Sequence, residues 1–81
     1  MWTQFYDLYS GGGRKTDYDS IYIELPENEA IEYFKSRFYL DPYNVTCSCC
    51  GSDFAVYEED EIPTYLKGVL IITKKEIDES F

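Results

Sequence analysis

The three cysteines of this chain, Cys47, Cys49 and Cys50, all lie in the stretch TCSCCGSD. Cys47 and Cys50 have the C-x-x-C spacing of a zinc knuckle, and Gly51 supplies the backbone freedom that such a turn needs. A structural zinc ion takes four ligands, usually thiolates and imidazoles, but the chain has no histidine and no second C-x-x-C. Cys49 could be a third ligand, and Asp53 or the cysteines of a second copy could complete the site.

The same cysteines allow two other interpretations. A redox role requires a thiol of lowered pKa, typically at the start of a helix. Here Asp53 and the acidic residues 58–61 would raise a thiol pKa, and Gly51 leads into a predicted strand. The third interpretation is structural, with small thiols filling the corner of a hairpin. We favour the structural interpretation and expect no bound cofactor, with a zinc ion on the three cysteines as the alternative.

The densest charge in the chain is the acidic tetrad formed by Glu58, Glu59, Asp60 and Glu61. Such a run is usually a solvated loop, but alternate strand residues lie roughly 6–7 Å apart, close to the spacing of phosphates along a nucleic-acid strand. The tetrad could therefore imitate successive phosphates for a basic groove on another protein. Tyrosine is enriched at interfaces, so neighbouring acids and tyrosines extend the predicted contact surface: Asp17, Tyr18, Asp19 and Tyr57.

The sequence holds no set of residues typical of an enzyme. A serine hydrolase would need a histidine, which the chain lacks. The stretch SGGGRKT resembles a phosphate-binding loop in composition, but Arg14 stands before Lys15 where the P-loop spacing requires glycine. It fits a connector, or a contact loop whose bare backbone can approach a partner. We therefore expect no catalytic activity.

Composition limits the class of protein and of partner. Residues 1–81 are enough for one domain, and nine Tyr, five Phe and one Trp can build its core. The net charge of −9 argues against direct binding to nucleic acid or to an anionic membrane. No apolar run is long enough to cross a bilayer, the first residues lack the pattern of a secretory signal, and the odd cysteine count favours a reducing cytosol.

The hydrophobic pattern predicts an α+β domain. Residues 2–9 and 21–25 are typical of strands, and a helix is expected from Pro26 to about Tyr39 with Ala30, Ile31, Phe34 and Phe38 on its buried side. Two short runs, 45–47 and 54–57, predict a hairpin with the cysteines at its corner. Residues 69–73 predict a central strand, and 74–81 a charged tail with one helical turn.

These elements predict one helix packed on a mostly antiparallel sheet of about four to five strands, in the chain order β-β-α-β-β-β. The acidic tetrad would then follow the second strand of the predicted hairpin. We expect neither repeats nor an internal linker.

Four segments of the chain resemble a family of small bacteriophage and prophage proteins of unknown function. They are MWTQFYDLYSGGGRK, IYIELPENEAIEYFKSRF, DPYNVTCSCCGSDFAV and VLIITKKEI, which together span most of the chain. The core V-T-C-x-C-C-G-x-D, paired with the earlier S-G-G, is the specific part of this likeness. The resemblance implies a phage origin and a location in the host cytoplasm. It assigns no catalytic residue.

A small, acidic, non-catalytic phage protein is expected to bind a host protein. Nucleases of host defence systems have positively charged guide and DNA channels, so we expect an anti-CRISPR-like or DNA-mimic inhibitor, as a monomer or homodimer. The alternative is a structural or accessory phage protein that self-associates, with cysteines of two copies sharing zinc.

Overall fold

The computed structural model describes residues 1–46, 48, 51–62 and 67–79. The predictions for Cys47, Cys49 and Cys50 therefore fall outside the described residues.

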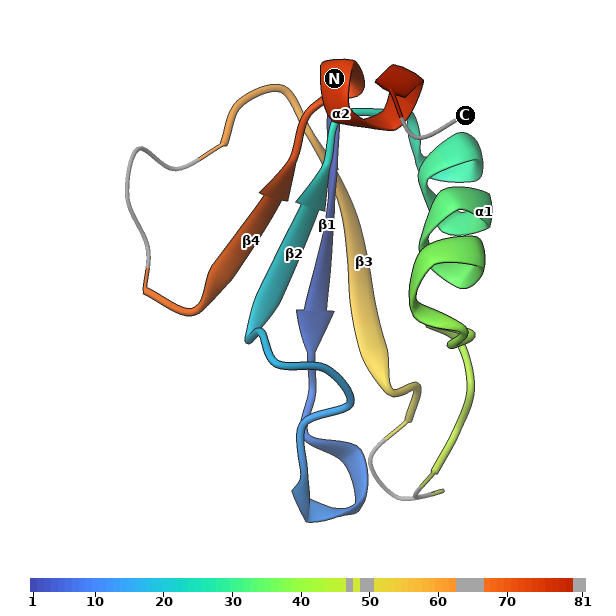
Figure 1. Ribbon diagram of the computed structural model, residues 1–81. Coiled ribbons are helices and arrows are strands. Elements are labelled where there is room, and N and C mark those ends of the chain that lie inside the picture. Colours follow the sequence, from blue (N-terminus) through green and yellow to red (C-terminus); the bar gives the residue numbers. More distant parts are fainter. Residues whose placement is uncertain (47, 49–50, 63–66, 80–81) are drawn as a thin grey trace.

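A four-stranded mixed sheet forms the centre of the molecule (Figure 1). Its spatial order is β3-β1-β2-β4, with β1 antiparallel to both of its neighbours and β4 parallel to β2. The predicted α+β class is confirmed, but the sheet is mixed. The strands are β1 (Trp2–Asp7), β2 (Ser20–Ile23), β3 (Phe54–Glu59) and β4 (Val69–Ile72).

The predicted hairpin at the cysteines is wrong. Val45 and Thr46 are not in a strand, and β3 pairs with β1. The reason is local, because the Asp53 carboxylate accepts hydrogen bonds from the Thr46 amide at 3.1 Å and the Thr46 hydroxyl at 3.0 Å. These side-chain bonds hold the segment in a turn and replace a strand ladder. Within the described residues the sheet thus has four strands, and the predicted five-strand arrangement is not found.

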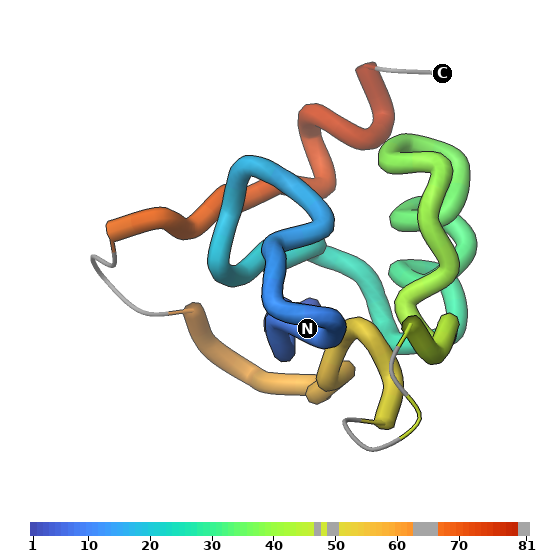
Figure 2. The backbone as a smooth tube through the Cα atoms, turned by 90° about the horizontal axis from the view of Figure 1, so that it is seen from below, coloured from blue at the N-terminus to red at the C-terminus, as the bar shows by residue number. Residues whose placement is uncertain are grey.

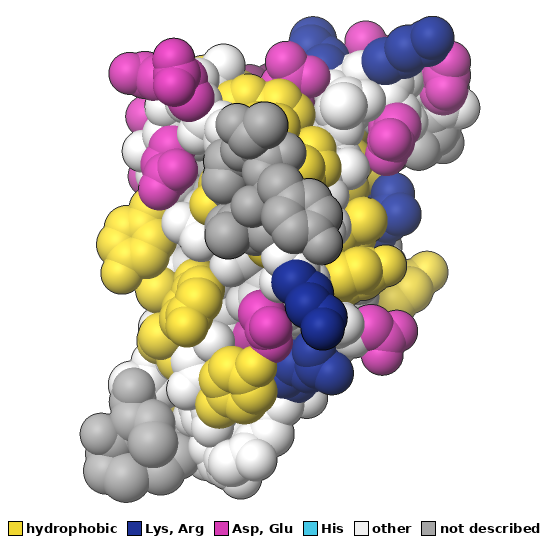
Figure 3. Space-filling model, turned by 90° about the vertical axis from the view of Figure 1, so that its left-hand side faces the viewer, with side chains coloured by type: hydrophobic (Ala, Val, Ile, Leu, Met, Phe, Trp, Pro, Cys, Tyr) yellow, Lys and Arg dark blue, Asp and Glu magenta, His cyan; other side chains and the backbone are white. Residues whose placement is uncertain are grey.

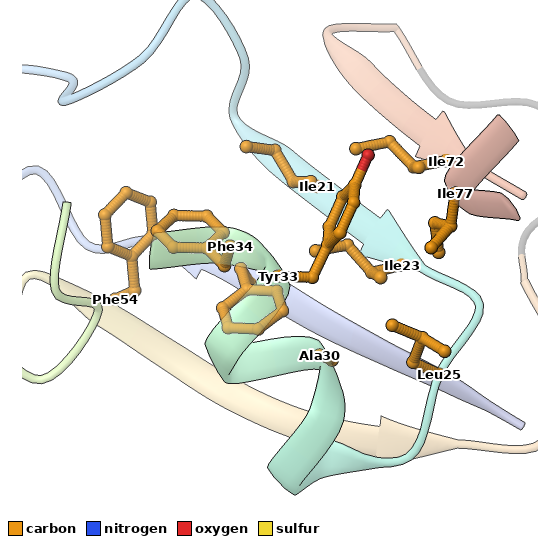
Figure 4. Close-up of a cluster of buried hydrophobic side chains, with 10 residues drawn as sticks. Ile21, Ile23, Leu25, Ala30, Tyr33, Phe34, Phe54, Ile72 and Ile77 are labelled. Carbon is orange, nitrogen blue, oxygen red and sulfur yellow. The ribbon is translucent and has the colours of Figure 1, made fainter. Parts of the chain in front are cut away.

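Strand β4 was expected at the centre of the sheet but lies at its edge, parallel to β2. Ile72 is buried in the core beside Ile77 of α2 (Lys74–Glu79) (Figure 4). Val69 and Ile71 are partly exposed, and strand alternation places them on the opposite side of the sheet. The apolar residues of β4 are therefore explained by burial of one side of the strand and by its parallel pairing with β2, and not by a central position in the sheet. The predicted helical turn in the tail is confirmed as α2.

The main helix, α1 (Glu27–Phe38), matches its prediction within a residue or two. It starts after Pro26, carries glutamates in its first turn and Lys35 and Arg37 in its last, as the helix dipole favours. It ends at Tyr39, whose φ of 56° is left-handed and whose amide bonds the Lys35 carbonyl at 3.0 Å. The left-handed Tyr39 therefore ends the helix.

Helix α1 lies on one face of the sheet (Figure 2). It packs there through aromatic rings (Figure 4). Phe34 stacks on Phe5 with ring centroids 4.5 Å apart and meets Phe54 edge-on at 5.1 Å. Of the predicted helix stripe, Ala30 and Phe34 are fully buried, while Ile31 and Phe38 pack at the edge of the core. Tyr33 is also buried and was not predicted.

The other face of the sheet is not covered by either helix, and we call it the open face. Strand alternation and register place on it the side chains opposite to the core. Tyr6 and Tyr57 are 43% and 56% exposed there, whereas Tyr22 is buried. Figure 3 shows this side of the molecule, with hydrophobic side chains over the strands. The open face consists of Trp2, Gln4, Tyr6, Ser20, Tyr22, Ala55, Tyr57, Glu59, Val69 and Ile71.

Candidate partner-binding surface

Acidic side chains gather at one end of the molecule, which we call the acidic end. Strands β2, β3 and β4 finish there, and helices α1 and α2 begin there (Figure 1). In Figure 3 acidic side chains crowd the upper rim, with basic side chains at the upper right. Lys74 and Lys75, at the start of α2, are among the cations of this region. Its acids are Glu24, Glu27, Glu29, Glu58, Glu59, Asp60, Glu61 and Glu76.

Two of these acids have a structural role as helix caps. The Glu58 carboxylate, at the end of β3, accepts a 3.0 Å hydrogen bond from the Glu27 amide at the start of α1. The Glu24 carboxylate, just after β2, accepts a 2.8 Å bond from the Lys74 amide at the start of α2. First-turn amides lack partners within their own helix, and a nearby negative charge also suits the helix dipole. The sequence predicts Glu58 only as a partner contact, and no local pattern indicates that this residue meets a distant helix.

The other three acids of the tetrad differ in accessibility. Glu59 is half-buried on the open face, and its charge lies close enough to Tyr22 to affect that hydroxyl. Burial raises the pKa of Tyr22, and the Glu59 carboxylate raises it further. Asp60 and Glu61 are exposed beyond the end of β3. Asp60 and Glu61 are therefore the tetrad carboxylates best placed to meet a partner.

The predicted contacts Asp17, Tyr18 and Asp19 lie at the other end of the sheet, before the start of β2. One strand length, roughly 13 Å for four residues, separates them from the tetrad. Asp19 forms an ion pair with Arg14 at 3.4 Å and accepts a hydrogen bond from the Tyr9 hydroxyl. Tyr18 packs against the core. The structure therefore does not bring this group together with the tetrad.

The glycine stretch is closed by its own hydrogen bonds. Gly11 and Gly12 have φ values of 76° and 87°, which side chains rarely adopt, so glycine is required for this turn. The buried Asp7 carboxylate accepts bonds from the Tyr9 amide at 2.8 Å and the Lys15 amide at 2.6 Å. The Lys15 ammonium donates to the Gly13 carbonyl at 2.8 Å and to the Ser10 carbonyl. Lys15 is thus bound to its own loop rather than presented to a phosphate.

Asp53 organises the segment that leads into the cysteines. Its two carboxylate oxygens accept hydrogen bonds from the Asn44 side-chain Nδ2 at 3.1 Å and from the Thr46 backbone amide and hydroxyl. Burial alone would raise the pKa of Asp53, but the bonds from Asn44 and Thr46 outweigh burial and lower it. Both oxygens are therefore engaged, which disfavours the residue as a zinc ligand.

The cysteines themselves lie outside the described residues. Among the residues that the structure does describe, no group of three or more potential ligand side chains is placed to hold a metal ion.

A groove of about 500 Å³ lies between α1 and α2. Leu25, Tyr33 and Ile77 contribute its apolar lining, and Glu29, Glu32 and Asp78 are among its polar lining residues.

Sequence reasoning missed two tyrosines beside β3. Tyr6 could have been found from the alternation in residues 2–7, because it is opposite in phase to the buried Thr3 and Phe5. Tyr43 is 50% exposed, and its hydroxyl donates to the Glu27 carboxylate at 3.3 Å. No sequence signal indicates that Tyr43 and Glu27, which lie in separate segments of the chain, are in contact.

Comparison of the chain with models of protein families, with curated proteins and with solved structures found no match. Within the described part of the chain, neither helix is long and apolar enough to cross a membrane.

Proposed function

We propose that this chain is a non-enzymatic inhibitor that binds a basic, nucleic-acid-binding surface of a host defence nuclease. The acidic end is the contact, and Asp60 and Glu61 are its leading residues. The protein acts in the host cytoplasm as an anti-CRISPR-like or DNA-mimic protein of phage origin. The phage origin and the compartment rest on the sequence resemblance described above.

The observation that carries this proposal is the clustering of carboxylates where three strands end and two helices start. Neighbouring strands lie roughly 4.8 Å apart, so the end of the four-stranded sheet spans about 15 Å and brings Glu24, Glu58 and Glu59 close together, with Asp60 and Glu61 directly after β3. A concentrated negative field of this kind attracts a cationic channel and speeds association. An even scatter of the same acids would give no such focus.

The positions of Asp17 and Asp19 exclude both residues from the proposed contact surface. Asp19 is already paired with Arg14, and both acids lie a strand length from the tetrad. We therefore assign the contact to the acidic end and the adjoining part of β3, including Tyr57.

The test is displacement of labelled double-stranded DNA from a purified, guide-loaded nuclease of the Cas9 type. We expect the wild-type protein to displace DNA and the double variant Asp60→Lys/Glu61→Lys to need about tenfold more protein, equivalent to about 1.4 kcal/mol. Both residues are exposed, and neither caps a helix through a contact like that of Glu58, so the fold should be retained.

The matched control is Asp17→Lys/Glu32→Lys, which changes the net charge of −9 by the same amount at exposed sites outside the acidic end. We expect this control to displace DNA nearly as well as the wild type. Equal loss in both double variants would mean that total charge, and not the acidic end, governs binding. No displacement by the wild type from any nuclease of the host would contradict the proposal.

A further inference from the structure

We propose that the outer edge of β3 binds an extended, arginine-containing segment of the partner by strand addition. This inference rests on the proposed function, because it specifies how the acidic surface engages a cationic protein.

The alternation of hydrogen bonds between β1 and β3 leaves the backbone N–H and C=O groups of two β3 residues pointing away from β1. The Leu8 amide bonds the Asp53 carbonyl at 3.0 Å, and the two residues are directly opposite in the β1–β3 register. Antiparallel ladders alternate, so Ala55, Tyr57 and Glu59 bond β1, while the intervening residues point their backbone groups away from it. The Phe54 amide is already used by the Pro42 carbonyl at 3.1 Å.

Val56 and Glu58 therefore present their N–H and C=O groups along the free edge. Within the described residues β3 pairs with β1 alone. Soluble proteins usually protect such an edge with charged side chains, especially lysine, with proline or with a bulge. The β3 sequence FAVYEE contains neither lysine nor proline, and its register with β1 is continuous over six residues. Its two charges, Glu58 and Glu59, repel an acidic strand but attract a cationic one.

Two half-exposed tyrosines flank this edge, one on each side. Tyr57 projects on the open face and is 56% exposed. Tyr43 lies on the helix side: its neighbour Pro42 bonds Phe54 at the start of β3, and its hydroxyl reaches Glu27. The Glu27 amide in turn bonds Glu58 near the end of β3. These contacts place Tyr43 beside β3 on its helix side.

These side chains favour a segment that contains arginine. A guanidinium group can stack on a tyrosine ring and pair bidentately with a carboxylate. The Glu58 and Glu59 carboxylates border the end of β3, and Asp60 and Glu61 follow them. A second copy of this chain would bring another net charge of −9 to the same place, which disfavours self-pairing. Charge complementarity therefore selects a cationic strand.

The first experiment uses a short, capped peptide of alternating arginine and threonine as the probe, with amide exchange of the whole protein followed by NMR. At saturating peptide we expect exchange at the Val56 and Glu58 amides to slow at least about tenfold, because these amides gain hydrogen-bond partners. A peptide N-methylated at alternate residues, which cannot complete the ladder, should bind at least about tenfold more weakly. Binding without protection of Val56 and Glu58, or equal binding of the N-methylated peptide, would overturn the inference.

A variant pair tests the edge from the protein's side. Val56→Pro removes an outward N–H without removing a bond to β1, and Val56→Thr retains that N–H. We expect Val56→Pro to bind the arginine–threonine peptide at least about tenfold more weakly and Val56→Thr to bind within about twofold of the wild type. If Val56→Pro does not fold, the N-methylated peptide decides the question. Protection of these amides in the peptide-free protein, with a doubled mass in solution, would assign the edge to a second copy and overturn the inference.

The two proposals can fail separately. If Asp60→Lys/Glu61→Lys loses nuclease binding while folded Val56→Pro retains it, the inhibitor function stands and strand addition is wrong. If the peptide protects the β3 edge but the wild-type protein binds no nuclease, the edge binds cationic strands and the proposed function is wrong.

Discussion

At the scale of single residues, Asp53 shows how one buried carboxylate fixes a segment without regular structure. Its bonds to Asn44 and Thr46 lower its pKa, so the folded protein holds the proton less tightly than the unfolded chain does. The stability contributed by ionised Asp53 is therefore present above about pH 4 and lost as the pH falls through the lowered pKa.

We expect Asp53→Asn to lower the free energy of unfolding by about 1–3 kcal/mol at pH 7, because the buried side chain loses its charge and one of the two oxygens that accept hydrogen bonds from Asn44 and Thr46. The difference from the wild type should shrink as the pH falls below about 4. Urea unfolding from pH 7 to pH 2 measures both effects, with Asp17→Asn as an exposed control. A difference that stays constant across this range would refute the assigned role of the charge.

At the scale of secondary-structure elements, α1 is stabilised by a carboxylate from another element. Glu58 of β3 accepts the Glu27 amide, so the cap joins two segments that are far apart in the sequence. It is a tertiary contact that also fixes where the helix starts relative to the sheet.

We expect Glu58→Ala to destabilise the protein by about 1 kcal/mol, and Glu58→Gln by about half as much, because glutamine keeps an acceptor but loses the charge. Thermal or urea unfolding of the two variants, beside Glu61→Ala as an exposed control, measures this order. Equal stability of Glu58→Ala and Glu61→Ala would show that the cap contributes nothing.

The elements also show what local sequence can and cannot predict. Helix α1 was predictable because Pro26, the order of its charges and the spacing of its apolar residues all lie within the helix. The hairpin prediction failed because the bonds from Thr46 to Asp53 compete with strand pairing. The edge position of β4 depends on its parallel pairing with β2, some fifty residues away in the chain.

At the scale of the whole molecule, the candidate surface depends on the strand directions. The tetrad was visible in the sequence, but its separation from Asp17 and Asp19 follows only when β2 and β3 are seen to end at the same edge of the sheet. The addition of Glu24, Glu27 and Glu76 to the acidic end likewise requires the fold. The net negative charge of the chain was predictable from its composition, whereas the concentration of carboxylates at one end of the molecule was not.

The most direct test of the account is the salt dependence of nuclease binding by the wild type and by Asp60→Lys/Glu61→Lys. We expect the affinity of the wild type to fall steeply between about 50 and 200 mM salt, since paired surface charges are screened over this range. The variant should bind more weakly at low salt and show a shallower slope, whereas Asp17→Lys/Glu32→Lys should keep the wild-type slope. A wild-type affinity that does not change with salt, or the same slope in all three proteins, would contradict a contact made by the acidic end.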